Sequence, residues 1–200
     1  MFGRGPLFWG AMVALTTALV VALAATGSIE GKAPLLLLAL VPCILAMIMF
    51  RAGYKAADDP ESVCGGTGEA QKRYIKRTAI FTSLYLATFG LLVFADLEFR
   101  ITREVRFALA LLPGLAITGV FWTIGRLIVE ETDEFIRMLV IRQTLIASAI
   151  ALTLATVWGF LESADVVPHL DAYWWAVAFF AGLFVGAVVN RIEHGTWGAV

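Results

Sequence analysis

Charged residues are scarce in this sequence: Asp, Glu, Lys and Arg make up 16% of the 200 residues, whereas 60% are hydrophobic. Soluble domains average about 25% charged residues. A water-exposed fold with so few charges would carry large apolar patches, whereas a surface that faces lipid has no such problem. The shortage of charge therefore argues against an ordinary soluble domain and favours an integral membrane protein. The net charge of −1 gives no ground for direct binding of nucleic acid.

Cysteine, histidine and catalytic motifs are also scarce. The two cysteines, Cys43 and Cys64, are too few for a disulfide framework, and we expect both to be free thiols. The two histidines, His169 and His194, are expected on opposite sides of a membrane, where they could not share a metal ion. The sequence contains no H-E-x-x-H, G-x-S-x-G or P-loop pattern. We therefore expect no enzyme activity, no metal site and no cofactor.

The sequence does contain six charge-free apolar runs, each long enough for a membrane-spanning helix. A bilayer core about 30 Å thick requires roughly 20 such residues. A β-barrel would need alternating apolar and polar residues, which the four leucines at 35–38 exclude. The predicted fold is an all-α bundle that forms a single transmembrane domain over residues 1–200, with spans at 7–27, 33–50, 78–95, 107–125, 143–161 and 172–190.

The positions of Lys and Arg predict how these spans are oriented. With the N-terminus in the cytoplasm, 11 of the 15 Lys and Arg residues lie inside, mostly in loops 51–77 and 126–142. Basic residues favour the cytoplasmic side of a bacterial inner membrane, so we expect both termini inside. A cleaved signal peptide ending near Ala24 is the alternative interpretation of the first run. Residues 96–106 fit either a plain outer turn or an interfacial helix.

Small residues recur every four positions in the last two runs, which places each series on one helix face. The series are Ala151, Ala155 and Gly159 in the fifth run and Ala178, Gly182 and Gly186 in the sixth. Small side chains let two helix backbones approach closely. The face with Gly182 and Gly186 fits either packing of the two helices within the chain or a homodimer. The short connection between the helices favours packing within the chain.

Pro42 and Pro113 lie inside the second and fourth runs. A proline lacks the backbone N–H, so it frees a carbonyl one turn earlier and allows a kink or cavity. These residues are candidate hinges or simple packing features. Ionisable residues are absent from the span centres, which argues against a proton-coupled pump. A small transporter or permease subunit for a neutral solute remains as an alternative function.

An acidic segment stands out in the second inner loop. Its candidate binding residues are Glu130, Glu131, Asp133, Glu134 and Arg137. We expect Thr132 to cap a short helix, with acidic residues in its first turn and Asp133 paired with Arg137. The segment is either an elbow helix at the membrane surface or an acidic docking face for a basic soluble partner. A divalent-metal site is the weakest of the three interpretations.

The same segment carries a resemblance to known proteins. Leu127, Glu130, Asp133, Glu134, Phe135 and Arg137, followed by two apolar runs, resemble a group of small bacterial inner-membrane proteins without an established activity. Members are often encoded beside a short helix-turn-helix regulator. The likeness covers roughly residues 125–191 and implies a membrane partner or anchor for a DNA-binding protein. We therefore expect a non-enzymatic membrane protein that binds a soluble cytoplasmic protein through its inner loops.

Overall fold

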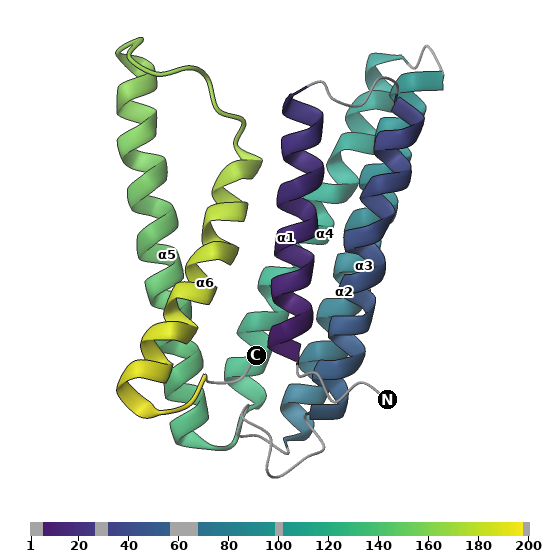
Figure 1. Cartoon of the computed structure of the whole chain (residues 1–200). Coiled ribbons are helices and arrows are strands. Elements are labelled where there is room, and N and C mark those ends of the chain that lie inside the picture. Colours follow the sequence, from purple (N-terminus) through teal and green to yellow (C-terminus); the bar gives the residue numbers. More distant parts are fainter. Residues whose placement is uncertain (1–5, 27–31, 57–67, 99–101, 198–200) are drawn as a thin grey trace. The chain divides into compact units, whose positions relative to one another are not determined.

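The computed structural model of the chain describes residues 6–26, 32–56, 68–98 and 102–197. Within these ranges it consists of helices and contains no strand. The helices are α1 (Pro6–Ala25), α2 (Lys32–Ala56), α3 (Glu69–Glu98), α4 (Arg103–Glu130), α5 (Glu134–Ser163) and α6 (Tyr173–His194), as Figure 1 shows. The all-α fold expected from the sequence is confirmed.

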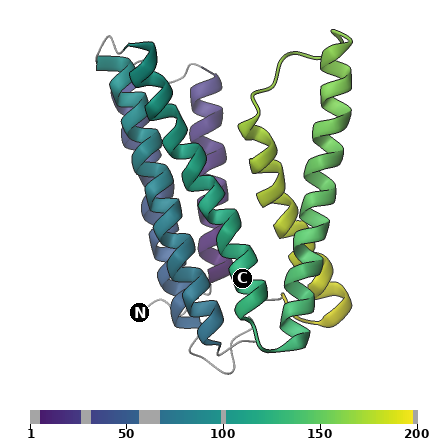
Figure 2. The ribbon, with the colours of Figure 1, turned by 180° about the vertical axis from the view of Figure 1, so that it is seen from behind.

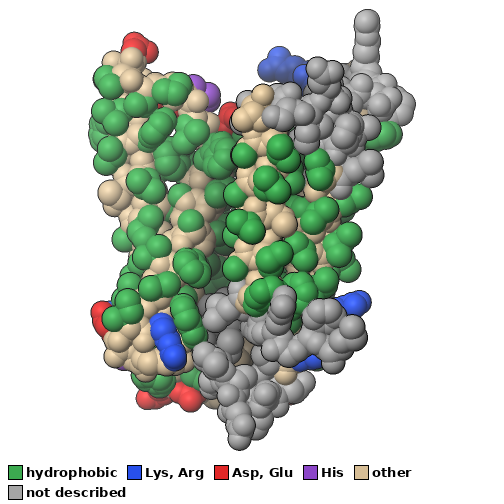
Figure 3. Space-filling model, in the orientation of Figure 1, with side chains coloured by type: hydrophobic (Ala, Val, Ile, Leu, Met, Phe, Trp, Pro, Cys, Tyr) green, Lys and Arg blue, Asp and Glu red, His purple; other side chains and the backbone are tan. Residues whose placement is uncertain are grey.

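Four of these helices, α3 to α6, are long enough and apolar enough to cross a membrane. Many of their large apolar side chains lie on the surface; Phe107 is 69% exposed and Phe160 is 73% exposed. Figure 3 shows hydrophobic side chains along the helices and charged side chains near the helix ends. An apolar surface of this extent is stable against lipid and not against water. The architecture is that of a multi-pass membrane protein.

The helices extend well beyond the apolar runs that predicted them. α3 begins at Glu69 and α5 at Glu134, so most of the charged residues before these two runs are helical. Loop 126–142 is thereby reduced to residues 131–133, and the separate elbow helix expected there is instead the first part of α5. The physical reason is that Glu, Lys, Arg, Leu and Met all have high helix propensity, so a change in polarity does not end a helix.

The first of two compact units contains α1 to α4, up to Val129. Its helices run alternately up and down beside one another (Figure 1). α1 packs against α2, and α2 against α3. α3 and α4 are joined by a hydrogen bond between the Thr78 and Thr123 hydroxyls, 2.9 Å apart. Thr123 is fully buried, so this contact lies inside the unit.

The second unit contains α5 and α6, which form an antiparallel hairpin. Figures 1 and 2 both show the two helices crossing near the start of α5 and separating toward the connection 164–172. The buried residues follow the same division, because Leu139 and Ala147 are fully buried whereas Phe160 is exposed. The interior of this unit therefore lies at the start of α5 and the end of α6.

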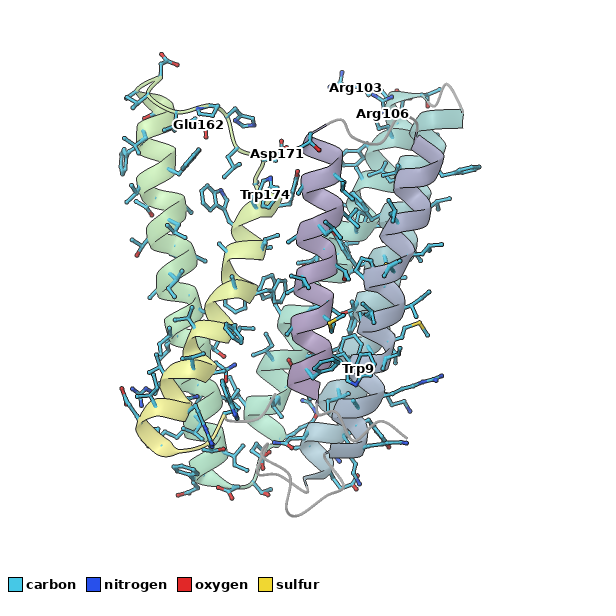
Figure 4. All side chains as sticks on the ribbon, viewed as in Figure 1. Trp9, Arg103, Arg106, Glu162, Asp171 and Trp174 are labelled. Atoms are coloured by element: carbon cyan, nitrogen blue, oxygen red, sulfur yellow. The ribbon has the colours of Figure 1, made fainter. Side chains whose placement is uncertain are left out.

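The segment 96–106 forms no helix of its own within the described residues. α3 ends at Glu98, and α4 begins at Arg103, with Arg103 and Arg106 in its first turn. Figure 4 labels these two arginines at that end of α4. Arg100 lies outside the described residues. Arg103 and Arg106 therefore lie in the first turn of α4, one of the helices long enough and apolar enough to cross a membrane.

Candidate functional site

The turn from α4 to α5 is held by two carboxylates that bind backbone N–H groups. Glu131 accepts hydrogen bonds from the N–H groups of Thr132 and Asp133, at 3.0 and 3.1 Å. Asp133 is the N-cap of α5 and accepts from Phe135 and Ile136, at 2.9 and 3.2 Å. These bonds satisfy donors that have no partner inside the helix. The turn is therefore fixed by its own acidic residues.

Two expectations for this turn were wrong in detail. Asp133 and not Thr132 is the helix cap, because its carboxylate is aimed at the first N–H groups of α5. Arg137 forms its ion pair with Glu134, at 3.7 Å, whereas the Asp133 carboxylate serves as the cap. The Glu134 side chain is 90% exposed, so this pair contributes little to stability. The Glu134 carboxylate therefore lies at the surface, beside Arg137.

A second cluster joins the start of α5 to the end of α6. Arg142 on α5 forms an ion pair with Glu193, and its guanidinium lies 2.8 Å from the His194 ring nitrogen. The His194 ring meets Phe135 edge to face, with ring centroids 5.9 Å apart. Sequence reasoning missed this cluster because its members lie about 50 residues apart. The only local signal was three polar residues at the two ends of a predicted hairpin.

Next to this cluster, two buried side-chain amides each donate a hydrogen bond to a backbone carbonyl of the opposite helix. Gln143 on α5 donates to the carbonyl of Leu183, at 3.0 Å, and Asn190 on α6 donates to the carbonyl of Leu139, at 3.1 Å. Both amides are nearly or fully buried. A hydrogen bond across a helix pair is worth about 1 kcal/mol in a membrane, and its directionality fixes the register of the helices.

The glycines of α6 lie directly on α5. An added Cβ at Gly182 would stand 2.7 Å from the Ala147 Cα, and one at Gly186 would stand 2.9 Å from the Gln143 Cα. No side chain fits at such distances without displacing a backbone. At Gly182 and Gly186 the glycine face is therefore covered by α5 of the same chain.

The rest of the small-residue series extends beyond this contact. On α5, Ala151 is buried, Ala155 is partly exposed and Gly159 is exposed, with open space where its Cβ would be. Ala178 on α6 is partly exposed. The series thus follows the separation of the two helices: close contact at Gly186, decreasing toward Gly159. Small residues every four positions marked the correct face but did not show where the contact ends.

The two candidate hinge prolines both lie within helices. Pro42 is inside α2 and is partly exposed, whereas Pro113 is inside α4 and is buried. Each leaves the carbonyl of the fourth preceding residue without its helical donor. Neither residue lies at the turn or at the ion cluster described above.

The connection between α5 and α6 contains a histidine between two carboxylates. His169 is hydrogen-bonded to Glu162 at 2.5 Å, and its other ring nitrogen lies 3.9 Å from Asp171. The hydrogen bond to Glu162 and the charge of that carboxylate raise the pKa of His169 above its ordinary value. Figure 4 shows Glu162 near the end of α5 and Asp171 and Trp174 near the start of α6. Trp158 steadies the connection by donating to the Pro168 carbonyl at 3.3 Å.

Among the described residues, no group of three or more His, Cys, Asp or Glu side chains could hold a metal ion. Cys43 is a free thiol in α2, whereas Cys64 lies outside the described residues. The acidic segment Glu130–Glu134 has the geometry of a capped turn, in which Asp133 caps α5 and the Glu134 side chain is exposed. No known protein family, curated protein or solved structure matches this chain.

Proposed function

We propose that all six helices cross a bacterial inner membrane and that both termini lie in the cytoplasm. α1 and α2 contain 20 and 25 residues. At about 1.5 Å per residue their lengths match or exceed a hydrocarbon core about 30 Å thick. The concentration of Lys and Arg in the connections on one side supports this orientation.

The orientation is tested by labelling Cys64 with a membrane-impermeant maleimide in a Cys43→Ala variant. In intact cells we expect no labelling, and we expect full labelling after permeabilisation, because the connection after α2 lies in the cytoplasm. The control is Ser163→Cys in a chain without the native cysteines, which should react in intact cells at the opposite end of α5. Labelling of Cys64 in intact cells would reverse the proposed orientation.

We further propose that the protein is not an enzyme and acts by binding a soluble, basic cytoplasmic protein at the turn before α5. The supporting observation is the exposed Glu134 carboxylate at the end of a turn held by Glu131 and Asp133. Phe135 beside it is 46% exposed and supplies an apolar contact. A turn that is already ordered loses little conformational entropy when a partner binds.

The structure divides the acidic residues of this docking turn into two groups. Glu131 and Asp133 bind the backbone, so their substitution would disturb the turn itself. Glu134 carries its charge outward, with its side chain 90% exposed. The resemblance of this segment to membrane proteins encoded beside helix-turn-helix regulators supports such a regulator as the partner.

The docking turn is tested by a photo-crosslinking amino acid placed at position 135 in living cells. We expect a single crosslinked product with a soluble basic protein, which the variant Glu134→Lys should abolish through charge repulsion. The matched control is Glu104→Lys at the opposite end of α4, which makes the same charge change and should leave the product unchanged. Equal crosslinking in both variants would remove the docking proposal.

A further inference from the structure

Two arginines and a tryptophan meet where α3 and α4 pack together. The Arg77 guanidinium lies 5.5 Å from the centre of the Trp122 ring, and the Arg126 guanidinium lies 6.0 Å from it. Both distances are within the range of cation–π attraction. The Trp122 side chain is 52% exposed, so the cluster lies on the outer surface of its unit. We call these three residues the arginine–tryptophan cluster.

The position of Trp122 is set by packing against α3. The Phe81 ring meets Trp122 edge to face, with centroids 6.1 Å apart. The same Phe81 ring occupies the space beside Gly119, where a Cβ would stand 2.2 Å from a ring carbon. The hydrogen bond between Thr78 and Thr123 fixes the register of the two helices one turn away. The indole is therefore positioned by α3 and lies beside both guanidinium groups.

The depth of the cluster is set by the sequence. Arg77 directly precedes the apolar run 78–95, and Arg126 directly follows the apolar run 107–125. Both arginines therefore stand where α3 and α4 leave the hydrocarbon, and Trp122 lies one helical turn deeper. This is the level of lipid phosphates and of the interfacial tryptophan belt. A guanidinium binds phosphate through several N–H donors in a fixed plane.

We propose that the arginine–tryptophan cluster is a binding site for the headgroup of an anionic phospholipid. The guanidinium groups of Arg77 and Arg126 donate to phosphate oxygens, and the glycerol and upper acyl chain lie against the exposed Trp122 ring. Basic sites between membrane helices bind multiply charged lipids in this way. The inference depends on the chain lying in a bilayer and not on the docking turn.

Glu130 provides a competing carboxylate, since it follows Arg126 by one turn of α4. A carboxylate at that spacing attracts the same guanidinium that the phosphate would bind. The variant Glu130→Gln should therefore bind anionic lipid about 2-fold to 5-fold more tightly. A loss of binding in this variant would contradict the assignment of Arg126 as a phosphate ligand.

The site is tested by native mass spectrometry of the full chain in detergent with added cardiolipin, phosphatidylglycerol or phosphatidylcholine. We expect the two anionic lipids to bind more tightly than phosphatidylcholine. A contribution of about 1 kcal/mol per arginine predicts an affinity loss of about 5-fold for R77Q or R126Q and about 30-fold for the pair. The charge-preserving pair R77K/R126K should retain only the part of the affinity that comes from charge, because lysine lacks the planar set of N–H donors.

The matched control removes two charges from the same end of α3 without touching the cluster. Arg73 and Lys76 are exposed on that helix, and R73Q/K76Q should change the affinity less than 2-fold. Equal losses in R77Q/R126Q and R73Q/K76Q would show diffuse attraction and overturn the site. If millimolar inorganic phosphate competes with the lipid, the ligand of the cluster is a soluble phosphate compound. That result would overturn the lipid proposal. If the double variant does not stay monodisperse, the single variants R77Q and R126Q make the same comparison.

Discussion

At the scale of single residues, neighbouring carboxylates form different interactions. The direction of each carboxylate's oxygen atoms decides whether it binds the backbone or lies at the surface. Glu131 is 5% exposed and binds the backbone of its own turn, whereas the side chain of Glu134 is 90% exposed. Asp133 lies between them and caps α5. A cluster of acidic residues in a sequence is therefore not a uniform charged surface. In the proposal above, the partner is contacted by the members whose oxygens bind no backbone N–H group.

The cap makes Asp133→Ala destabilising. Loss of the two hydrogen bonds to Phe135 and Ile136 should lower the free energy of unfolding by about 1 kcal/mol, measured by denaturation in mixed micelles. The neighbouring variant Thr132→Ala should change it by less than about 0.5 kcal/mol, because Thr132 is exposed and its hydroxyl does not cap the helix. Equal costs for the two variants would contradict the assignment of the cap.

The His169 ring should titrate with a pKa above its ordinary value of 6.5, because the Glu162 carboxylate stabilises the protonated ring. The contact between His169 and Glu162 therefore stabilises the fold at pH values below the ordinary pKa of histidine. This contribution is lost as the pH rises through the raised pKa of His169. The variant Glu162→Gln should return the pKa toward 6.5 in an NMR titration, whereas Asp171→Asn should shift it less, because Asp171 lies 3.9 Å from the ring. An unchanged pKa in Glu162→Gln would contradict this coupling.

At the scale of helices, features of three kinds join α5 and α6 from the middle of the hairpin to the start of α5 and the end of α6. The glycines bring the backbones together, the buried amides fix their register, and the cluster of Arg142, Glu193 and His194 closes the end. Toward the connection 164–172 the helices separate, and Gly159 has open space beside it. The hairpin is therefore held at the end where the docking turn begins.

This asymmetry predicts opposite effects for the same substitution on the two helices. Gly182→Ala places a Cβ 2.7 Å from the Ala147 Cα and should lower the free energy of unfolding by about 1–3 kcal/mol. Gly159→Ala meets no atom and should leave stability unchanged or raise it by up to about 1 kcal/mol, since Ala favours the helix. Both are measured by denaturant titration in mixed micelles. Loss of stability in Gly159→Ala would show that α5 has another close neighbour there.

At the scale of the whole molecule, the chain divides into a unit of α1 to α4 and a unit of α5 and α6. Each has its own buried contacts: Thr123 with Thr78 in the first, and Asn190 with Leu139 in the second. The proposed lipid site lies in the first unit, and the proposed docking turn begins the second. The two proposals can therefore fail independently.

The division predicts a local response to damage in the second unit. In hydrogen–deuterium exchange, Gly186→Ala should speed exchange in α5 and α6, because its Cβ would stand 2.9 Å from the Gln143 Cα. Exchange in α3 and α4 should stay as in the unmodified chain. Equal acceleration in all four helices would show that the two units unfold as one.

Six helices and their apolar character follow from the sequence by itself, because uninterrupted apolar runs about 20 residues long form helices wherever lipid replaces water. The helix ends do not follow, since charged residues such as Glu69 and Glu134 have high helix propensity and continue the helix past the apolar run. The spacing of small residues predicted that Gly182 lies on a contact face. Only the folded structure shows that Ala147 is the residue against which it packs.

Tertiary structure alone decided which distant polar residues meet. Arg142 and Glu193, or Arg77 and Trp122, stand about 50 residues apart and carry no common motif. Their meeting depends on the register and crossing of packed helices, which many side chains set together. The structure also shows which carboxylates of the acidic segment bind the backbone and which lie at the surface, since a hydrogen bond depends on direction and not on composition.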